Sequence, residues 1–272
     1  MAQRIRLNDG RTMPTLGLGT WPMDDAEAER VVARALELGY RHVDTAVRYG
    51  NERGVGRGIA ASGLPREEVF VTTKVDGEHM GVGKAEIGLR GSLVRLGLEY
   101  VDLLLIHWPL PARDLYVDTW RTFERLRDAG LVRSIGVSNF KPAHLERLAR
   151  ETATVPAVNQ VQLNPYVTRE DHRRYHDEHG IVTVSYSPLG KGGELLSDPV
   201  VARVAAAHGR TPAQVVLRWH LQLGLVPIPK TSHEDRLREN LDVYSFDLTP
   251  DEMTALSALD RGRGVDSDAV GH

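Results

Sequence analysis

The sequence predicts an α/β fold, a single (β/α)8 barrel of the TIM type spanning residues 1–272, with an N-terminal β-hairpin closing its bottom. Short apolar runs alternate with amphipathic stretches along the chain, and such alternation implies parallel strands. The chain has 272 residues, and eight strand–helix units in about 250 residues match a closed barrel. A sequence typical of a hairpin turn precedes the first unit, and a hairpin there would close the bottom of a barrel.

The first half of the chain contains four of these units. The segment 8–11, Asn-Asp-Gly-Arg, is typical of a hairpin turn. Asp24 and Glu27 have the spacing of a capping box that opens a helix, and Gly39 ends that helix. We expect strands at 15–20, 40–43, 69–73 and 101–106, and helices at 24–38, 51–61, 84–96 and 118–129.

The second half repeats the same unit without a linker rich in Pro, Gly or Ser, so we expect one domain. The predicted strands are 134–137, 157–160, 181–184 and 226–229, and the predicted helices follow residue 142 and cover 169–178, 199–207, 212–223, 233–241 and 250–259. An open doubly wound sheet is the competing architecture. It would require a glycine fingerprint after the first strand, and the segment 17–22, GLGTWP, lacks the third glycine.

Composition excludes several classes of function. The net charge of −3 and the lack of a dense basic stripe argue against a nucleic-acid partner. Because there are no cysteines, disulfides, thiolate nucleophiles and cysteine-ligated metal sites are excluded. No stretch reaches the roughly 20 apolar residues of a membrane span, and the first six residues lack the apolar segment of a signal peptide. We therefore expect a cytoplasmic protein that does not bind membranes.

Four apolar runs end in residues able to do chemistry. Asp44 follows one of them, with Tyr49 just beyond, and Lys74, His107 and Lys230 end the others. The carboxyl ends of parallel barrel strands open onto one face, so these residues should meet there. Each residue taken alone has an ordinary structural explanation, but a group converging on one rim favours a proton-handling site.

Tyr49 is the candidate general acid. A free phenol has a pKa of about 10, and a neighbouring ammonium lowers the pKa by favouring the phenolate. Lys74 could supply that ammonium, with Asp44 holding it in place. His107 could donate a hydrogen bond to a substrate oxygen and orient it.

Long segments around these residues resemble the aldo-keto reductase family. They are GYRHVDTAVRYGNE at 39–52, Lys74, LIHWP at 105–109, SIGVSNF at 134–140 and IPKTSHEDRLREN at 228–240. The similarity covers nearly the whole chain in the same order. The short loops look most like the bacterial branch that includes diketogluconate reductases.

This resemblance implies a barrel that binds NADP(H), and NAD(H) more weakly, without a Rossmann domain. Tyr49, Lys74, Asp44 and His107 match the catalytic residues of the family, which passes hydride from the cofactor to a carbonyl carbon while Tyr49 protonates the oxygen. The implied partner is a small-molecule carbonyl substrate. We expect a monomer without a bound metal.

The resemblance also implies cofactor contacts. Ser138, Asn139 and Gln160 would hold the carboxamide and Tyr186 would stack on the nicotinamide, while Lys230 and Arg236 would take the 2′-phosphate. His233 departs from the residue types of the family. The full expected set is Thr20, Trp21, Ser138, Asn139, Gln160, Tyr186, Ser187, Leu189, Lys191, Lys230, Thr231, Ser232, His233, Arg236, Glu239 and Asn240.

The predicted substrate wall consists of Trp21, Tyr49, His107 and Trp108. The segment 75–79 is small and polar, and the tail 261–268 is short and has a flexible composition. Together they predict a shallow, open pocket for small aldehydes or polar dicarbonyls.

Two other classes of function compete with this prediction. His172, His176 and His179 recur at helical spacing, but charged residues surround them and the His-Glu-x-x-His pattern is absent, so a metal-dependent hydrolase is disfavoured. A redox sensor that binds cofactor without useful turnover is the second alternative.

Overall fold

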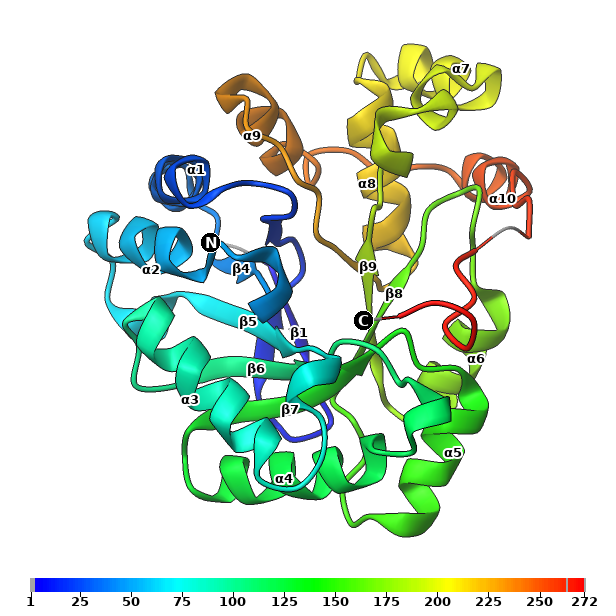
Figure 1. The fold of residues 1–272 in the computed structure, drawn as a ribbon. Coiled ribbons are helices and arrows are strands. Elements are labelled where there is room, and N and C mark those ends of the chain that lie inside the picture. Colours follow the sequence, from blue (N-terminus) through cyan, green and yellow to red (C-terminus); the bar gives the residue numbers. More distant parts are fainter. Residues whose placement is uncertain (1–2, 263, 272) are drawn as a thin grey trace.

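The structure is a computed structural model that describes residues 3–262 and 264–271. Eight parallel strands form a sheet in the order β10-β9-β8-β7-β6-β5-β4-β3, and helices surround it (Figure 1). The strands are β3 (Leu18–Gly19), β4 (His42–Asp44), β5 (Phe70–Val75), β6 (Val101–Ile106), β7 (Val132–Ser138), β8 (Val158–Gln162), β9 (Val182–Tyr186) and β10 (Val226–Pro227). The helices are α1 (Asp25–Leu38), α2 (Glu52–Ala61), α3 (Lys84–Leu96), α4 (Tyr116–Asp128), α5 (Pro142–Glu151), α6 (Glu170–Glu178), α7 (Pro199–His208), α8 (Pro212–Gln222), α9 (Glu234–Leu241) and α10 (Pro250–Ser257).

Backbone hydrogen bonds close the sheet into a barrel. Gly17 N donates to Pro227 O and Gly19 N donates to Pro229 O, both at 3.1 Å. A Cβ atom at position 19 would lie 2.8 Å from Ile228 O, so only glycine lets the first and last strands approach this closely. The predicted barrel is confirmed.

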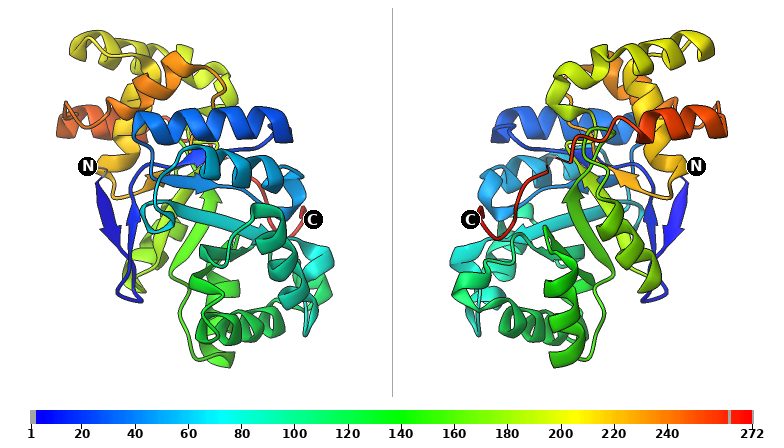
Figure 2. Two further views of the ribbon diagram at one scale, coloured as in Figure 1. Left: turned by 90° about the vertical axis from the view of Figure 1, so that its left-hand side faces the viewer. Right: turned by 90° about the vertical axis from the view of Figure 1, so that its right-hand side faces the viewer.

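The hairpin of β1 (Arg4–Arg6) and β2 (Thr12–Pro14) covers the amino ends of the strands. Its turn is held by Asn8 Nδ2, which donates to Pro156 O at 3.0 Å, and by Asp9, which accepts from Ser134 Oγ at 2.6 Å. Pro156 lies just before β8, and Ser134 lies in the amino-terminal half of β7. Figure 2 shows the hairpin and the C-terminal tail at opposite ends of the barrel, which leaves the carboxyl rim for the site.

The strands formed by the apolar runs are buried on both faces. In β6, Leu103 and Leu105 pack inside the barrel, in a cluster that includes Met13 of the hairpin. Leu104 and Ile106 point the other way, into the cluster formed with the helices. Successive residues of a strand face opposite sides, so a strand covered on both sides needs a continuous apolar run.

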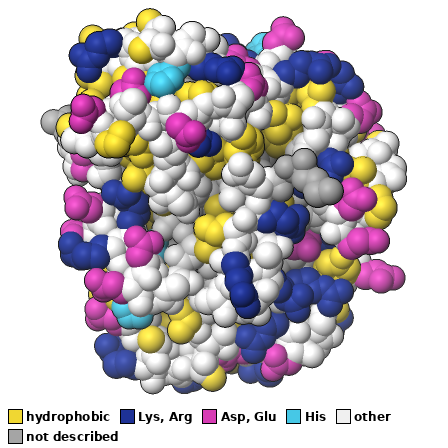
Figure 3. All heavy atoms as spheres, turned by 180° about the vertical axis from the view of Figure 1, so that it is seen from behind, with side chains coloured by type: hydrophobic (Ala, Val, Ile, Leu, Met, Phe, Trp, Pro, Cys, Tyr) yellow, Lys and Arg dark blue, Asp and Glu magenta, His cyan; other side chains and the backbone are white. Residues whose placement is uncertain are grey.

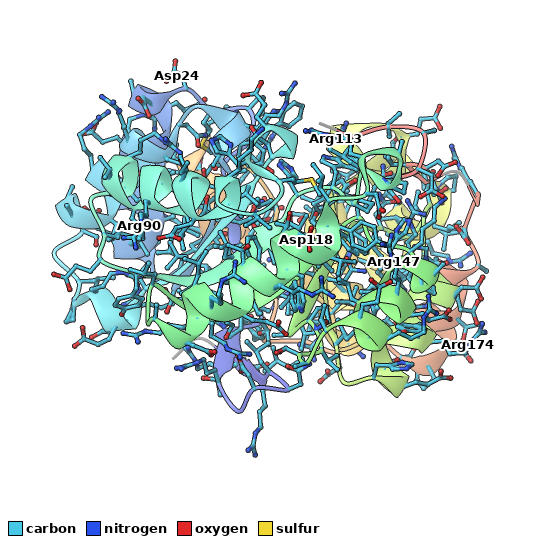
Figure 4. All side chains as sticks on the ribbon, turned by 60° about the horizontal axis from the view of Figure 1, so that its bottom comes forward. Asp24, Arg90, Arg113, Asp118, Arg147 and Arg174 are labelled. Carbon is cyan, nitrogen blue, oxygen red and sulfur yellow. The ribbon has the colours of Figure 1, made fainter. Side chains whose placement is uncertain are left out.

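Charged side chains cover the outside. Arg90, Asp118 and Arg147 lie on the outer helices (Figure 4), and Arg147 NH1 lies 2.5 Å from Asp114 Oδ1. Acidic and basic side chains are intermingled on the face opposite to that of Figure 1 (Figure 3). Within residues 3–262 and 264–271, none of the helices is both long and apolar enough to cross a membrane.

Two local predictions are wrong in detail. The first apolar run forms only two residues of strand, Leu18–Gly19, which pair with β4, and it meets the last strand through the backbone N–H groups of Gly17 and Gly19. The capping box at α1 is half-formed. Asp24 Oδ1 accepts from Glu27 N at 2.8 Å, but the Glu27 carboxylate lies near Lys230 Nζ instead of returning a bond to Asp24.

Candidate active site

Neighbouring strand ends bring together the four predicted proton-handling residues, which we call the tetrad. Asp44 is the last residue of β4, Lys74 is the penultimate residue of β5, and His107 follows β6 directly. Tyr49 ends a short 3-10 helix, Val47–Tyr49, that turns the chain back over the rim after β4. Parallel pairing of β4 with β5, and of β5 with β6, therefore sets these side chains side by side.

Lys74 is the centre of this group, and its side chain is fully buried. Its Nζ donates to Asp44 Oδ1 at 2.5 Å, to Thr45 O at 3.0 Å and to Tyr49 Oη at 3.3 Å. An ammonium has three N–H donors, and each has an acceptor here. The Tyr49 oxygen thus accepts a bond from Lys74, which leaves the Tyr49 O–H to donate to another acceptor.

Opposing effects act on the Tyr49 phenol. Burial raises the pKa of Tyr49, and the Asp44 carboxylate adds to the rise, while the Lys74 charge and hydrogen bond lower it. The net pKa is above the ordinary value of a tyrosine. The expectation of a net lowering was wrong, because burial outweighs the ammonium. Tyr49 is therefore protonated at neutral pH, which is the state that a proton donor needs.

The ammonium of Lys74 keeps its charge. Burial by itself lowers the pKa of Lys74, but the charges of Asp44 and Tyr49 and their hydrogen bonds outweigh burial and raise it. Lys74 is therefore positively charged at neutral pH, beside the Tyr49 oxygen. A positive charge at this distance stabilises the phenolate that proton donation would leave behind.

Asp44 links Lys74 to β8 and to the end of β3. Its second oxygen, Oδ2, accepts from Gln160 Nε2 at 2.7 Å, and its backbone oxygen accepts from Thr20 Oγ1 at 3.0 Å. Both donors belong to the expected cofactor set, yet in the structure their side chains donate to Asp44. Thr20 is completely buried, so it supports Asp44 and does not line an open surface.

His107 and Trp108 border Tyr49. The rings of His107 and Tyr49 are 5.7 Å apart at their centroids and nearly perpendicular, and the rings of His107 and Trp108 are stacked at 6.3 Å. The backbone oxygen of His107 accepts from Asn139 Nδ2 at 3.0 Å. Three of the four residues of the predicted substrate wall, Tyr49, His107 and Trp108, thus lie in one row, whereas the Trp21 ring contacts Lys191.

A polar row runs from His107 across β7 and β9. Asn139, in the left-handed region at φ 63°, contacts Ser138 Oγ at 3.1 Å through Nδ2 and accepts from Tyr186 Oη at 2.9 Å through Oδ1. Ser138 Oγ donates to Gln160 O at 2.9 Å. The partly exposed Tyr186 ring therefore ends a row of amide and hydroxyl groups, which suits a planar ligand bearing a carboxamide.

The expected cofactor residues from Lys230 to Asn240 follow β10. Lys230 and Arg236 are exposed, and Lys230 Nζ donates to Ser232 Oγ at 3.2 Å. His233 precedes α9, and its backbone N donates to Thr231 Oγ1 at 3.2 Å. This segment presents two cations to solvent, with the half-buried Ser232 hydroxyl beside one of them, as a phosphate site requires.

Two residues of the expected cofactor set are already engaged within the protein. The Glu239 carboxylate accepts a hydrogen bond from Thr211 Oγ1. Asn240 is buried and holds a hydrogen bond with Tyr40 that lowers the pKa of Tyr40 against the dominant effect of burial. Glu239 therefore ties α9 to the start of α8, and Asn240 ties α9 to Tyr40, which follows α1.

The loop after β9 crosses toward the start of α1. Lys191 Nζ lies 5.7 Å from the centre of the Trp21 ring, and Trp21 is 55% exposed. Ser187 and Lys191 adopt left-handed backbone angles, and Leu189 is half-buried between them. This contact joins the loop after β9 to the segment that precedes α1.

Sequence reasoning assigned no role to two buried polar residues behind Tyr49. Asn51 Nδ2 donates to Thr20 O at 3.1 Å and to Met23 O at 3.0 Å. Glu52, 1% exposed, accepts from Thr73 Oγ1 and from Arg95 Nε, both at 2.6 Å. Both residues lie at the start of α2, two and three positions after Tyr49, and both end the 39–52 segment that resembles the family, which was the available signal.

The C-terminal tail is tied across the carboxyl rim, which corrects the expectation of a flexible segment. Lys141 Nζ lies 2.6 Å from both Asp266 Oδ1 and Asp268 Oδ2. Arg169 NH2 donates to Val265 O at 2.6 Å. A Cβ atom at Gly271 would lie 3.2 Å from Trp108 Cβ, so the end of the tail packs against the substrate wall.

The histidines on α6 have structural partners. The nitrogens of His176 lie 2.9 Å from Asn159 Nδ2 and 2.8 Å from Thr183 Oγ1, and burial lowers the pKa of His176 to about 3. No group of three His, Asp or Glu side chains suited to a metal occurs among residues 3–262 and 264–271.

Comparisons with known proteins show the family to which this chain is similar. The model of the Aldo/keto reductase family matches residues 15–261. A 2,5-diketo-D-gluconic acid reductase B from Corynebacterium sp. is 50% identical over 268 residues, covering 98% of this chain and 97% of the relative. An aldo-keto reductase from Mycolicibacterium smegmatis is 47% identical over 268 residues, with the same coverage.

Solved structures show the same fold at similar identity. A mutant of Gox0644 in complex with NADPH has a TM-score of 0.95 and 44% identity, covering 100% of this chain and 99% of that chain. An aldo/keto reductase from Brucella melitensis has a TM-score of 0.92 and 43% identity, covering 96% of this chain and 100% of that one. The chain therefore belongs to the aldo/keto reductase family.

Proposed function

We propose that the protein reduces aldehydes or ketones to alcohols with NADPH, and that Tyr49 donates the proton. The observation that carries this proposal is the buried Lys74 ammonium. It donates to both Asp44 and the Tyr49 oxygen and so leaves the Tyr49 O–H available for a substrate. Bound NADPH would supply the hydride.

Residues of the tetrad donate the proton, stabilise the phenolate and orient the substrate. Tyr49 delivers its proton to the carbonyl oxygen, while Lys74 stabilises the resulting phenolate. His107, beside Tyr49, hydrogen-bonds the same oxygen and orients it. Asp44, fixed by Gln160 and Thr20, holds Lys74 in position.

The arrangement of the cofactor set supports NADPH. Ser138, Asn139 and Tyr186 form one polar row beside the tetrad, suited to the nicotinamide and its carboxamide. Lys230 and Arg236 are exposed cations beyond β10, suited to the 2′-phosphate. NAD(H) would bind more weakly, because its ribose hydroxyl gains less from these cations.

The substrate would be a small polar aldehyde or dicarbonyl. Trp21 is largely exposed at the mouth, and Trp108 and the tail form one wall. A relative at 50% identity is a 2,5-diketo-D-gluconic acid reductase, which supports a polar dicarbonyl. The cytoplasmic location and monomeric state stay predictions from the sequence.

The test is NADPH oxidation by a panel of carbonyl compounds, measured with both nicotinamide cofactors and with a chelator present. We expect turnover of small aldehydes and polar dicarbonyls, faster with NADPH at low cofactor concentration. Cofactor binding without turnover of any compound would favour the redox sensor. Loss of activity with the chelator would favour a metal-dependent enzyme.

Lys230→Ala should weaken NADPH binding about tenfold or more and leave NADH binding nearly unchanged, since charge-assisted phosphate contacts are stronger than neutral hydrogen bonds. Fluorescence titration with each cofactor measures the two dissociation constants. Lys84→Ala, which removes a lysine at the first position of α3, is the matched control. Equal losses for both cofactors would refute the phosphate assignment.

A further inference from the structure

The Glu27 carboxylate reaches the proposed phosphate site from a different element. Glu27 lies in the first turn of α1, and its Oε1 is 3.8 Å from Lys230 Nζ. Each side chain is 31% exposed, so solvent and ligands have access to the pair. The contact follows from barrel closure, because the helix after β3 starts beside the loop after β10.

Helix capping does not account for the position of this carboxylate. On α8 and α10 the residues at the matching helix position, Gln214 and Glu252, return a hydrogen bond to the cap and complete a capping box. On α1 only one of the two hydrogen bonds forms, the one that Asp24 Oδ1 accepts from Glu27 N. The Glu27 backbone is thus anchored, while its carboxylate extends toward Lys230.

The charge of Glu27 acts on the two cofactors in opposite directions. A 2′-phosphate has to share Lys230 with Glu27, and the two anions repel each other across a short distance. A ribose 2′-hydroxyl can donate to a carboxylate, which is how acidic residues favour NAD in other dinucleotide sites. Glu27 therefore opposes the preference that Lys230 and Arg236 create.

We propose that Glu27 is a specificity-determining residue that weakens NADPH binding and supports NADH binding, so that both cofactors are usable. The proposal rests on the proposed function, since it takes Lys230 as the 2′-phosphate ligand. It assigns the degree of cofactor preference to one carboxylate on α1, outside the Lys230–Asn240 segment.

The test compares Glu27→Gln with wild type by isothermal titration, using NADPH, NADH, adenosine 2′,5′-bisphosphate and 5′-AMP. The last two ligands differ only in the 2′-phosphate and report binding without catalysis. We expect Glu27→Gln to bind NADPH and the bisphosphate about fivefold more tightly, the upper range for coupling between partly exposed charges. Binding of NADH and 5′-AMP should be weaker, because the carboxylate that accepts from the ribose hydroxyl is lost. The NADPH gain should shrink as salt is raised, because the coupling is screened.

The matched control is Glu29→Gln. Glu29 lies on the same helix and pairs with Arg57 Nε at 2.6 Å, so its removal changes the net charge equally without touching Lys230. The control should leave all four affinities unchanged.

Two results would contradict the role of Glu27, and a third would contradict the phosphate assignment on which that role depends. An unchanged NADPH affinity in Glu27→Gln, or an equal gain for NADPH and NADH, would rule out selectivity by Glu27. If Lys230→Ala still weakened NADPH selectively, the proposed function would stand. If Lys230→Ala also left the bisphosphate affinity unchanged, the phosphate assignment itself would be wrong.

Discussion

We expect Tyr49→Phe to lower kcat for carbonyl reduction by roughly a hundredfold to ten-thousandfold, the range for loss of a general acid. The variant keeps the ring that packs against His107 and removes only the hydroxyl that Lys74 contacts. NADPH affinity should therefore stay nearly constant. Steady-state kinetics and fluorescence titration measure the two quantities.

Tyr244→Phe is the matched control. The hydroxyl of Tyr244 is hydrogen-bonded to Thr15 Oγ1 at 2.9 Å, away from the tetrad, so its removal should change kcat less than about twofold, as expected of a site without contact to the reacting atoms. A Tyr49→Phe enzyme that retained a substantial fraction of the wild-type rate would mean that another group supplies the proton.

Lys74→Met should abolish reduction and destabilise the protein by about 3–5 kcal/mol, the usual cost of breaking a buried ion pair. Asp44 is 1% exposed, and without Lys74 its negative charge would be left uncompensated in the interior. The Tyr49 phenolate would also lose its nearest positive charge. Urea unfolding and initial rates measure the two effects.

The double variant Asp44→Asn/Lys74→Met separates stability from chemistry. Removing both charges should recover much of the lost free energy of unfolding, because no unpaired buried charge remains, yet activity should stay absent. A Lys74→Met single variant as stable as wild type would show that the pair is not the buried contact described above.

Much of the fold followed from local sequence signals. Runs such as 101–106 are apolar on both faces, which only a strand covered by helices outside and side chains inside can satisfy. Because parallel strands end at one rim, Asp44, Lys74 and His107 could be placed together without knowing any distance.

Other features depend on contacts that no local pattern encodes. The C-terminal tail has the composition of a flexible segment, but Lys141 pairs with two of its aspartates. The direction of the Tyr49 pKa shift depended on how far burial outweighs Lys74, and burial is a property of the assembled rim. The direction of the Glu27 carboxylate also depends on the assembled fold, because Lys230 lies near it only in the closed barrel.

The pH dependence of the hydride-transfer rate in a single turnover tests the central claim most directly. Because burial raises the pKa of Tyr49, the proton donor stays protonated through neutral pH. The rate should be constant from about pH 6 to about pH 9 and fall only as pH rises past about 10, the ordinary value of a phenol. A fall centred near about pH 6.5, the ordinary value of an imidazole, would identify a histidine as the donor and contradict the assignment of Tyr49.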